Sequence, residues 1–91
     1  MAAEQRIVKF KGNVQGVGFR YTSTRTAKQY EITGYVKNMP DGTVELVAEG
    51  EKKEIDAFLS DLKEQMSRHI RDTQQQTANP SGRYSSFGVA Y

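Results

Sequence analysis

One stripe of apolar side chains constrains the fold of this chain more than any other feature. Five bulky residues recur at the spacing of an α-helix: Ile55, Phe58, Leu59, Leu62 and Met66. They form a single apolar face, and such a face is stable in water only when another element covers it. We therefore expect a helix here that packs against a β-sheet. The alternating apolar pattern of the segments 6–11, 32–38 and 43–49 predicts the strands of that sheet.

The remaining segments complete the order of elements. Pro40-Asp41-Gly42 is a strong turn signal, so the two strands beside it are predicted to form a hairpin. A first helix is predicted from Phe19 to Tyr30, although its threonines weaken it. Phe87 to Tyr91 alternates and predicts a closing strand. Residues 70–78 fit either an exposed edge strand or an irregular segment.

The resulting order is β-α-β-β-α-β. Packing rules turn it into an α+β, ferredoxin-like sandwich, with an antiparallel sheet and both helices on one face. In the third strand we expect Glu45 and Glu49 to lie on a solvated face. Residues 1–91 contain no repeat or linker and are predicted to form a single domain. Many unrelated functions use this arrangement, so it does not name one.

Composition excludes several kinds of chemistry. The chain has no cysteine, which excludes disulfides, thiolate nucleophiles and zinc ribbons. His69 is the only histidine, so no site or relay built from several histidines is expected. No apolar run approaches the ~20 residues of a membrane span, and the first residues lack the apolar core of a signal peptide. The expected location is the cytoplasm.

Charge is distributed unevenly. Residues 1–39 carry a net charge of +5, whereas the whole chain carries only +2. This excess fits an ordinary solvated surface, but it also fits a positive field that attracts a small anion. Composition does not choose between the two.

The most informative segment is the glycine-rich stretch from Gly12 to Arg20, between the first strand and the first helix. Glycines at positive φ let successive amide groups converge on an anion, and a helix N-terminus adds its free donors. Arg20 would stand there with a planar fork that suits two phosphate oxygens. No Lys-Ser/Thr follows, as a Walker loop requires, and no third glycine completes a dinucleotide fingerprint. Spacing alone also fits a structural turn followed by a surface arginine.

Three motifs together resemble the acylphosphatase family: Val14–Arg20, Gly34–Asn38 and Asp41–Glu45. The resemblance extends over almost the whole chain and implies a hydrolase that cleaves acyl phosphates to a carboxylate and inorganic phosphate. It implies that backbone amides of the loop hold the phosphoryl group, at Gln15, Gly16, Val17, Gly18, Phe19 and Arg20. It further implies that Arg20 binds the phosphate by charge and that Asn38 orients the attacking water.

The same resemblance implies no metal, no cofactor and no covalent intermediate. The expected partner is a small acyl phosphate, with inorganic phosphate or sulfate as product or mimic. Neither nucleic acid nor a membrane is expected as a partner, and the chain is expected to be a monomer. Two departures from the family stand out. Asn13 lies where the family often has arginine, and Glu31 lies where it commonly has glycine, so a left-handed Glu31 would cost about 1 kcal/mol.

Two other functions remain open. The basic first half motivates a nucleic-acid-binding module, but such modules stack bases on aromatic residues of central strands. The predicted strand 43–49 has no aromatic residue and carries two glutamates, which argues against this function. The other alternative is a domain of the same family that binds an anion without catalysis. The presence of both Arg20 and Asn38 argues against that alternative.

Overall fold

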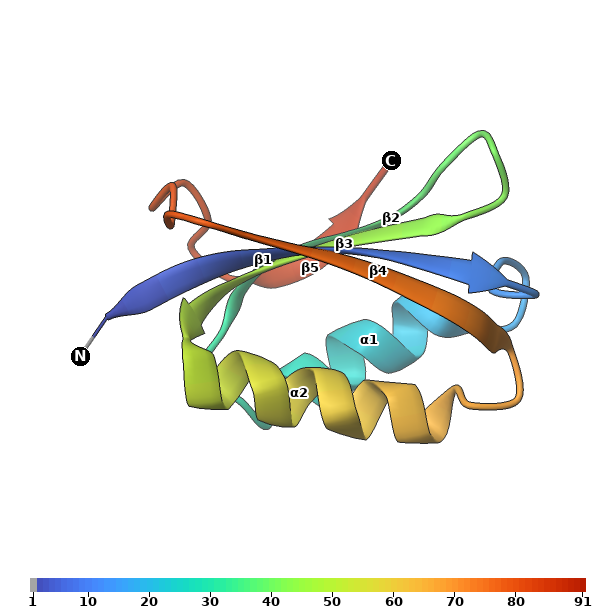
Figure 1. Ribbon diagram of the computed structural model, residues 1–91, viewed down its shortest axis with the longest axis horizontal. Coiled ribbons are helices and arrows are strands. Elements are labelled where there is room, and N and C mark those ends of the chain that lie inside the picture. Colours follow the sequence, from blue (N-terminus) through green and yellow to red (C-terminus); the bar gives the residue numbers. More distant parts are fainter. Residues whose placement is uncertain (1) are drawn as a thin grey trace.

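The computed structural model describes residues 2–91 as one sheet covered on one face by two helices (Figure 1). In chain order the elements are β1 (Ala3–Gly12), α1 (Phe19–Ala27), β2 (Thr33–Asn38), β3 (Val44–Glu51), α2 (Lys52–Gln65), β4 (Ile70–Ala78) and β5 (Phe87–Ala90). The strand order across the sheet is β4-β1-β3-β2-β5. This confirms the predicted ferredoxin-like α+β fold with both helices on one face.

The core lies between the sheet and the helices. The predicted helical stripe, Ile55 to Met66, is buried along its whole length and closes over the sheet. The facing strand residues are also buried, because alternate positions of β1 and β3 point to the helices: Val8, Phe10, Val44, Leu46 and Ala48. The sequence pattern and the packing therefore agree in the centre of the molecule. Among residues 2–91, neither helix is long and apolar enough to cross a membrane.

The sheet was predicted to be antiparallel throughout, but one of its two edge strands is parallel to its neighbour. Residues 70–78 form β4, an exposed edge strand that pairs antiparallel with β1, so the edge-strand alternative was right. The closing strand is confirmed as β5, but it is a fifth strand that pairs parallel with β2. The sheet is therefore mixed, although its first four strands are antiparallel. The reason is that the chain crosses from one edge of the sheet to the other between β4 and β5.

The first helix is shorter than predicted, since α1 ends at Ala27 and turns follow to Tyr30. Glu31 does not adopt a left-handed conformation, because every positive φ among residues 2–91 belongs to glycine. The amide of Glu31 instead donates a hydrogen bond of 2.8 Å to the Glu54 carboxylate. The strain anticipated at this position does not arise.

Glu49 anchors the crossing segment 79–86, contrary to the expectation of a solvated side chain. Its carboxylate is buried and accepts hydrogen bonds from the Ser81 amide (2.8 Å), the Ser81 hydroxyl (2.7 Å) and the Gly82 amide (3.0 Å). The Gln5 side chain donates a fourth, of 2.6 Å. Burial acts to raise the pKa of Glu49, but these donors outweigh it and lower the pKa to about 2. The segment that leads into β5 is thus held to the sheet by a charged group.

We predict that this anchor makes stability depend on acidity. The pKa of Glu49 falls from 4.5 to about 2 on folding, so its contribution is complete above pH 4.5 and is lost as the pH falls toward 2. Replacing Glu49→Gln should lower the free energy of unfolding at pH 7 by about 1–3 kcal/mol. Urea denaturation of both proteins between pH 2.5 and pH 7 measures the difference, which should shrink in acid. A difference that stays constant over this range would contradict the assignment.

Candidate active site

The loop between β1 and α1 presents open backbone donors. Gly16 and Gly18 have φ values of 76° and 78°, a left-handed conformation that other residues adopt only with strain. Gly18 is also the N-cap of α1, and no side chain among residues 2–91 caps the helix there. None of the turn and cap hydrogen bonds in this part of the chain uses an amide of residues 15–20 as its donor. Open amides at a glycine loop and at a helix N-terminus are groups that can bind an anion.

Gln15 fixes the loop to the β2–β3 turn. Its side-chain amide donates hydrogen bonds of 2.8 Å to the Met39 carbonyl and 2.9 Å to the Thr43 carbonyl. Thr43 also accepts a hydrogen bond from the Met39 amide, at 2.9 Å, so the three residues form one connected unit. The loop is therefore held beside the end of β2, where Asn38 lies.

The start of α1 is held to the sheet by a buried contact between two aromatic rings. The rings of Phe19 and Phe10 are 4.9 Å apart, and both side chains are buried. Val14 is fully buried, and Val17 packs on the edge of the same core. Of the residues predicted to bind phosphate, Gln15 and Val17 have side chains engaged elsewhere, and neither lines the cavity described below.

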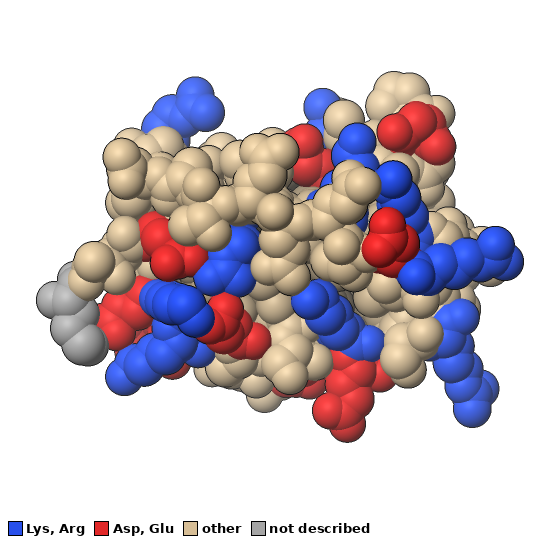
Figure 2. Space-filling model, in the orientation of Figure 1, with Lys and Arg blue, Asp and Glu red and all other residues tan. Residues whose placement is uncertain are grey.

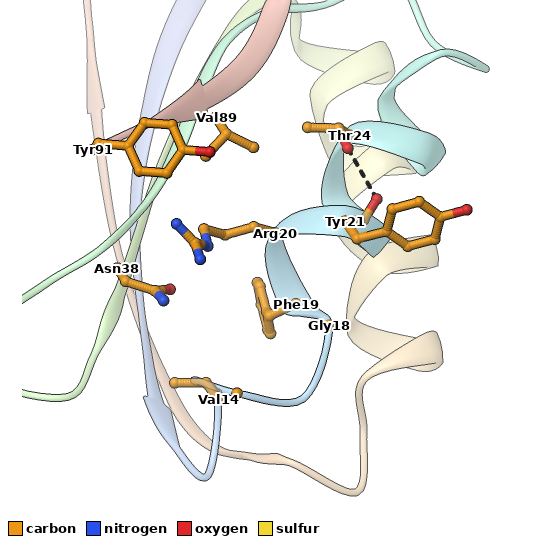
Figure 3. Close-up of a pocket in the computed structure, with 10 residues that line it drawn as sticks. Val14, Gly18, Phe19, Arg20, Tyr21, Thr24, Asn38, Val89 and Tyr91 are labelled. Atoms are coloured by element: carbon orange, nitrogen blue, oxygen red, sulfur yellow. Dashed lines mark hydrogen bonds between the residues drawn. The ribbon is translucent and has the colours of Figure 1, made fainter.

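Arg20 and Asn38 meet at one cavity of about 350 Å³. Figure 3 shows the Arg20 side chain extending from the first turn of α1 toward Asn38 on β2. Two further residues predicted from the sequence, Gly16 and Gly18, line the cavity, and so does Phe19. The structure thus brings together residues that are far apart in the sequence, at the place where the loop donors are open.

Both polar side chains are free to bind a ligand. None of the four ion pairs in the described residues includes Arg20. Its Cζ atom lies 5.4 Å from the centre of the Tyr91 ring, a cation–π contact that uses no N–H group. The Oδ1 atom of Asn38 is buried and has no hydrogen-bond partner among residues 2–91. This atom therefore needs a hydrogen-bond donor from outside the chain, such as water or a ligand in the cavity.

Five residues that the sequence did not single out for the site also line the cavity: Val14, Tyr21, Thr24, Val89 and Tyr91. The alternation of Phe87, Val89 and Tyr91 placed the last two on one face of a strand, but not beside Arg20. That position depends on the parallel pairing of β5 with β2, which no local pattern signals. Asn13, the departure in the loop, is exposed and does not line the cavity.

The cavity therefore combines amide donors, one guanidinium and one carboxamide. This set fits a small tetrahedral anion and a water molecule beside it. The described residues contain no group of three or more His, Asp or Glu side chains placed to hold a metal ion. On the face seen in Figure 2, basic and acidic groups are interspersed.

Comparison with known proteins agrees with this geometry. The family model for acylphosphatase matches residues 6–89. An acylphosphatase of Archaeoglobus fulgidus is 47% identical over 81 residues, which cover 88% of this chain and 90% of that protein. An acylphosphatase of Lactobacillus gasseri is 38% identical over 86 residues, covering 92% of this chain and 94% of the relative.

Solved structures are similar over the same extent. The crystal structure of the acylphosphatase from Bacillus subtilis has a TM-score of 0.85 at 29% identity, covering 97% of this chain and 99% of its own. Full-length HypF in its phosphate- and nucleotide-bound form contains a similar region, with a TM-score of 0.88 at 32% identity. This region covers 98% of the present chain but only 12% of that protein. On the family match and the curated relatives, this chain belongs to the acylphosphatase family.

Proposed function

We propose that this chain hydrolyses acyl phosphates, with the phosphoryl group held by the loop amides and Arg20 and the attacking water oriented by Asn38. Family membership supports the reaction. The observation that carries the residue roles is the convergence of Arg20, Asn38 and the open loop on one cavity.

The substrate chemistry explains why so few groups suffice. In an acyl phosphate the leaving group is a carboxylate, which departs readily, so neither a strong nucleophile nor a strong base is needed. The enzyme has to place water in line with phosphorus and stabilise the charge on the equatorial oxygens. Fixed donors around those oxygens contribute about 3–4 kcal/mol each in comparable sites. In this mechanism the positive charge comes from Arg20 and the amide dipoles, and no metal ion takes part.

The step balances without a cofactor. The water oxygen attacks phosphorus while the bond from phosphorus to the carboxyl oxygen breaks, and its electron pair leaves with the carboxylate. The two protons of the water end on the phosphate, one on the new oxygen and one on a non-bridging oxygen of the same group. Asn38 directs the water through its carboxamide, whose unpartnered Oδ1 accepts one of the water's hydrogens. Every part of the site comes from one chain, so we expect the enzyme to act as a monomer.

The alternative of a nucleic-acid-binding module gains no support from the sheet. On the face away from the helices, the central strands β1 and β3 present Ile7, Lys9, Glu45 and Val47. None of these four is aromatic. Tyr35 of the neighbouring inner strand β2 lies on the same face, but its ring packs against Tyr84, with 5.8 Å between the ring centres, and its hydroxyl donates a hydrogen bond to Glu45, so it is not an open platform for a base. We therefore propose that the binding partner is a small anion rather than an RNA strand.

The reaction is tested by comparing substrates. The purified chain should hydrolyse benzoyl phosphate and be nearly inactive on a phosphate monoester such as 4-nitrophenyl phosphate, because the site supplies no general acid for a poorer leaving group. Turnover should be unchanged after dialysis against a chelator. Equal activity on both substrates, or loss of activity with the chelator, would contradict the proposal.

Arg20 is predicted to serve both binding and turnover. Arg20→Ala should lower kcat by about 10³-fold and also weaken inhibition by inorganic phosphate, because the guanidinium contacts the phosphoryl group before and during the reaction. Arg20→Lys should be similarly impaired, since a point charge does not replace a planar fork. Steady-state kinetics with phosphate as the inhibitor measures both effects. Near-normal turnover of Arg20→Ala would remove Arg20 from the mechanism.

Replacing Asn38 is predicted to affect turnover, but neither phosphate binding nor thermal stability. Asn38→Ala should abolish detectable turnover while inhibition by phosphate stays largely unchanged, because the carboxamide holds water rather than phosphate. The variant should unfold at nearly the same temperature as the parent, because the Oδ1 atom of Asn38 makes no hydrogen bond within residues 2–91 that the substitution would remove. Thermal denaturation beside the kinetics tests this pair of effects. A marked fall in Tm together with lost activity would indicate a structural role instead.

A further inference from the structure

Exposed apolar side chains gather at one place on the molecule. The large hydrophobic residues that are exposed among residues 2–91 are Tyr21, Val89 and Tyr91, at 67%, 36% and 93%. Single exposed apolar residues scattered over a surface need no explanation. These three are not scattered, because each of them lines the cavity that contains Arg20 and Asn38.

The direction of β5 determines where two of them point. The Phe87 ring lies 5.5 Å from the Phe58 ring of α2, so this face of β5 is the one that faces the helices. Val89 follows at a two-residue step and continues this face of β5, and Tyr91 follows directly after the end of the strand. In Figure 3 both side chains lie on the side of the cavity opposite α1, with Arg20 reaching toward Tyr91 and Asn38 nearby. Tyr21 differs, because its ring points away from this space and lies 5.6 Å from the Cζ atom of Arg25.

The contact between Tyr91 and Arg20 leaves the charge available. The ring lies 5.4 Å from the Cζ atom of Arg20 and takes none of the guanidinium's N–H donors. The cavity thus has a polar part, made by the loop, Arg20 and Asn38, and an apolar part beside it, made by Val89 and Tyr91. An acyl phosphate has the same two parts, a phosphoryl group and an organic acyl group, joined by one oxygen.

We propose that Val89 and Tyr91 form an acyl wall, against which the organic part of the substrate packs, and that Tyr91 makes the enzyme favour flat or branched apolar acyl groups over acetyl. The proposal rests on the function proposed above and specifies its substrate class. A cavity of about 350 Å³ is small for a ligand site, which suits a single ring or a short branched chain. The wall contributes through apolar contact with the substrate and not through the reacting atoms.

Two substrates and three variants test the acyl wall. We would measure kcat/KM for benzoyl phosphate and for acetyl phosphate with the parent chain, Tyr91→Ala, Tyr91→Phe and Val89→Thr. The ratio of the two values should fall about 2- to 10-fold in Tyr91→Ala, the range expected for one aromatic contact. It should fall in Val89→Thr and remain within twofold of the parent in Tyr91→Phe, which keeps the ring. Tyr91 is 93% exposed, so its replacement should not disturb folding, and circular dichroism checks this.

Tyr21→Ala is the matched comparison, because it removes the other exposed tyrosine of the cavity, whose ring points away from the substrate space. Its ratio should change less than that of Tyr91→Ala. If Tyr91→Ala lowers kcat/KM equally for both substrates, the acyl wall is wrong and Tyr91 acts through Arg20, while the hydrolase itself stands. If Tyr21→Ala changes the ratio as much as Tyr91→Ala, the selectivity does not come from the wall. If the parent chain hydrolyses neither substrate, the proposed function fails, and the wall fails with it.

Discussion

The site depends on the register of β3 against its two neighbours. Val44 pairs with Phe10 of β1 on one side and with Asn38 of β2 on the other. The end of β1, from which the loop departs, is therefore level with the Asn38 carboxamide across a single strand. A one-residue shift of β2 against β3 would turn Asn38 to the opposite face of the sheet, and the same shift of β1 would take Phe10 out of the core. The burial of Val44 and its neighbours thus fixes the distance between two groups that the proposed reaction needs together.

The molecule uses two concave sets of backbone donors in different ways. The amides of Ser81 and Gly82 converge on the chain's own carboxylate at Glu49, so that set is filled and serves to hold a segment in place. The amides of residues 15–20 find no such partner, and four residues of this loop, Gly16, Gly18, Phe19 and Arg20, line the cavity. Gln15 resembles Glu49 in its effect, since its side chain joins its loop to a neighbouring turn. Polar side chains thus fix the backbone around a site whose donors stay free.

Sequence reasoning succeeded where one face of an element is buried. The apolar stripe of α2 and the alternation in β1 and β3 predict both the elements and the core, because burial imposes the periodicity. It left 70–78 open because β4 is held by its ladder to β1 and has few apolar contacts to create a pattern. The prediction that Glu49 is solvated was wrong. Alternation shows on which face of the sheet a side chain lies, but it does not show that the segment 79–86 covers that face. The residues Arg20 and Asn38 were identified through motifs, whereas Tyr91 depends on tertiary pairing alone.

Because β5 is a short strand at the edge of the sheet, its exposed positions tolerate amino-acid substitutions more readily than the core does. Only Phe87 to Ala90 pair with β2, at the rim of the sheet, and most of the core does not involve them. Phe87 packs against Phe58 of α2 and belongs to the frame, whereas Val89 can be replaced without touching the core, Arg20 or Asn38. If Val89 and Tyr91 form the proposed acyl wall, substitutions at these two positions would change which organic acids are released while Arg20, Asn38 and the loop stay unchanged.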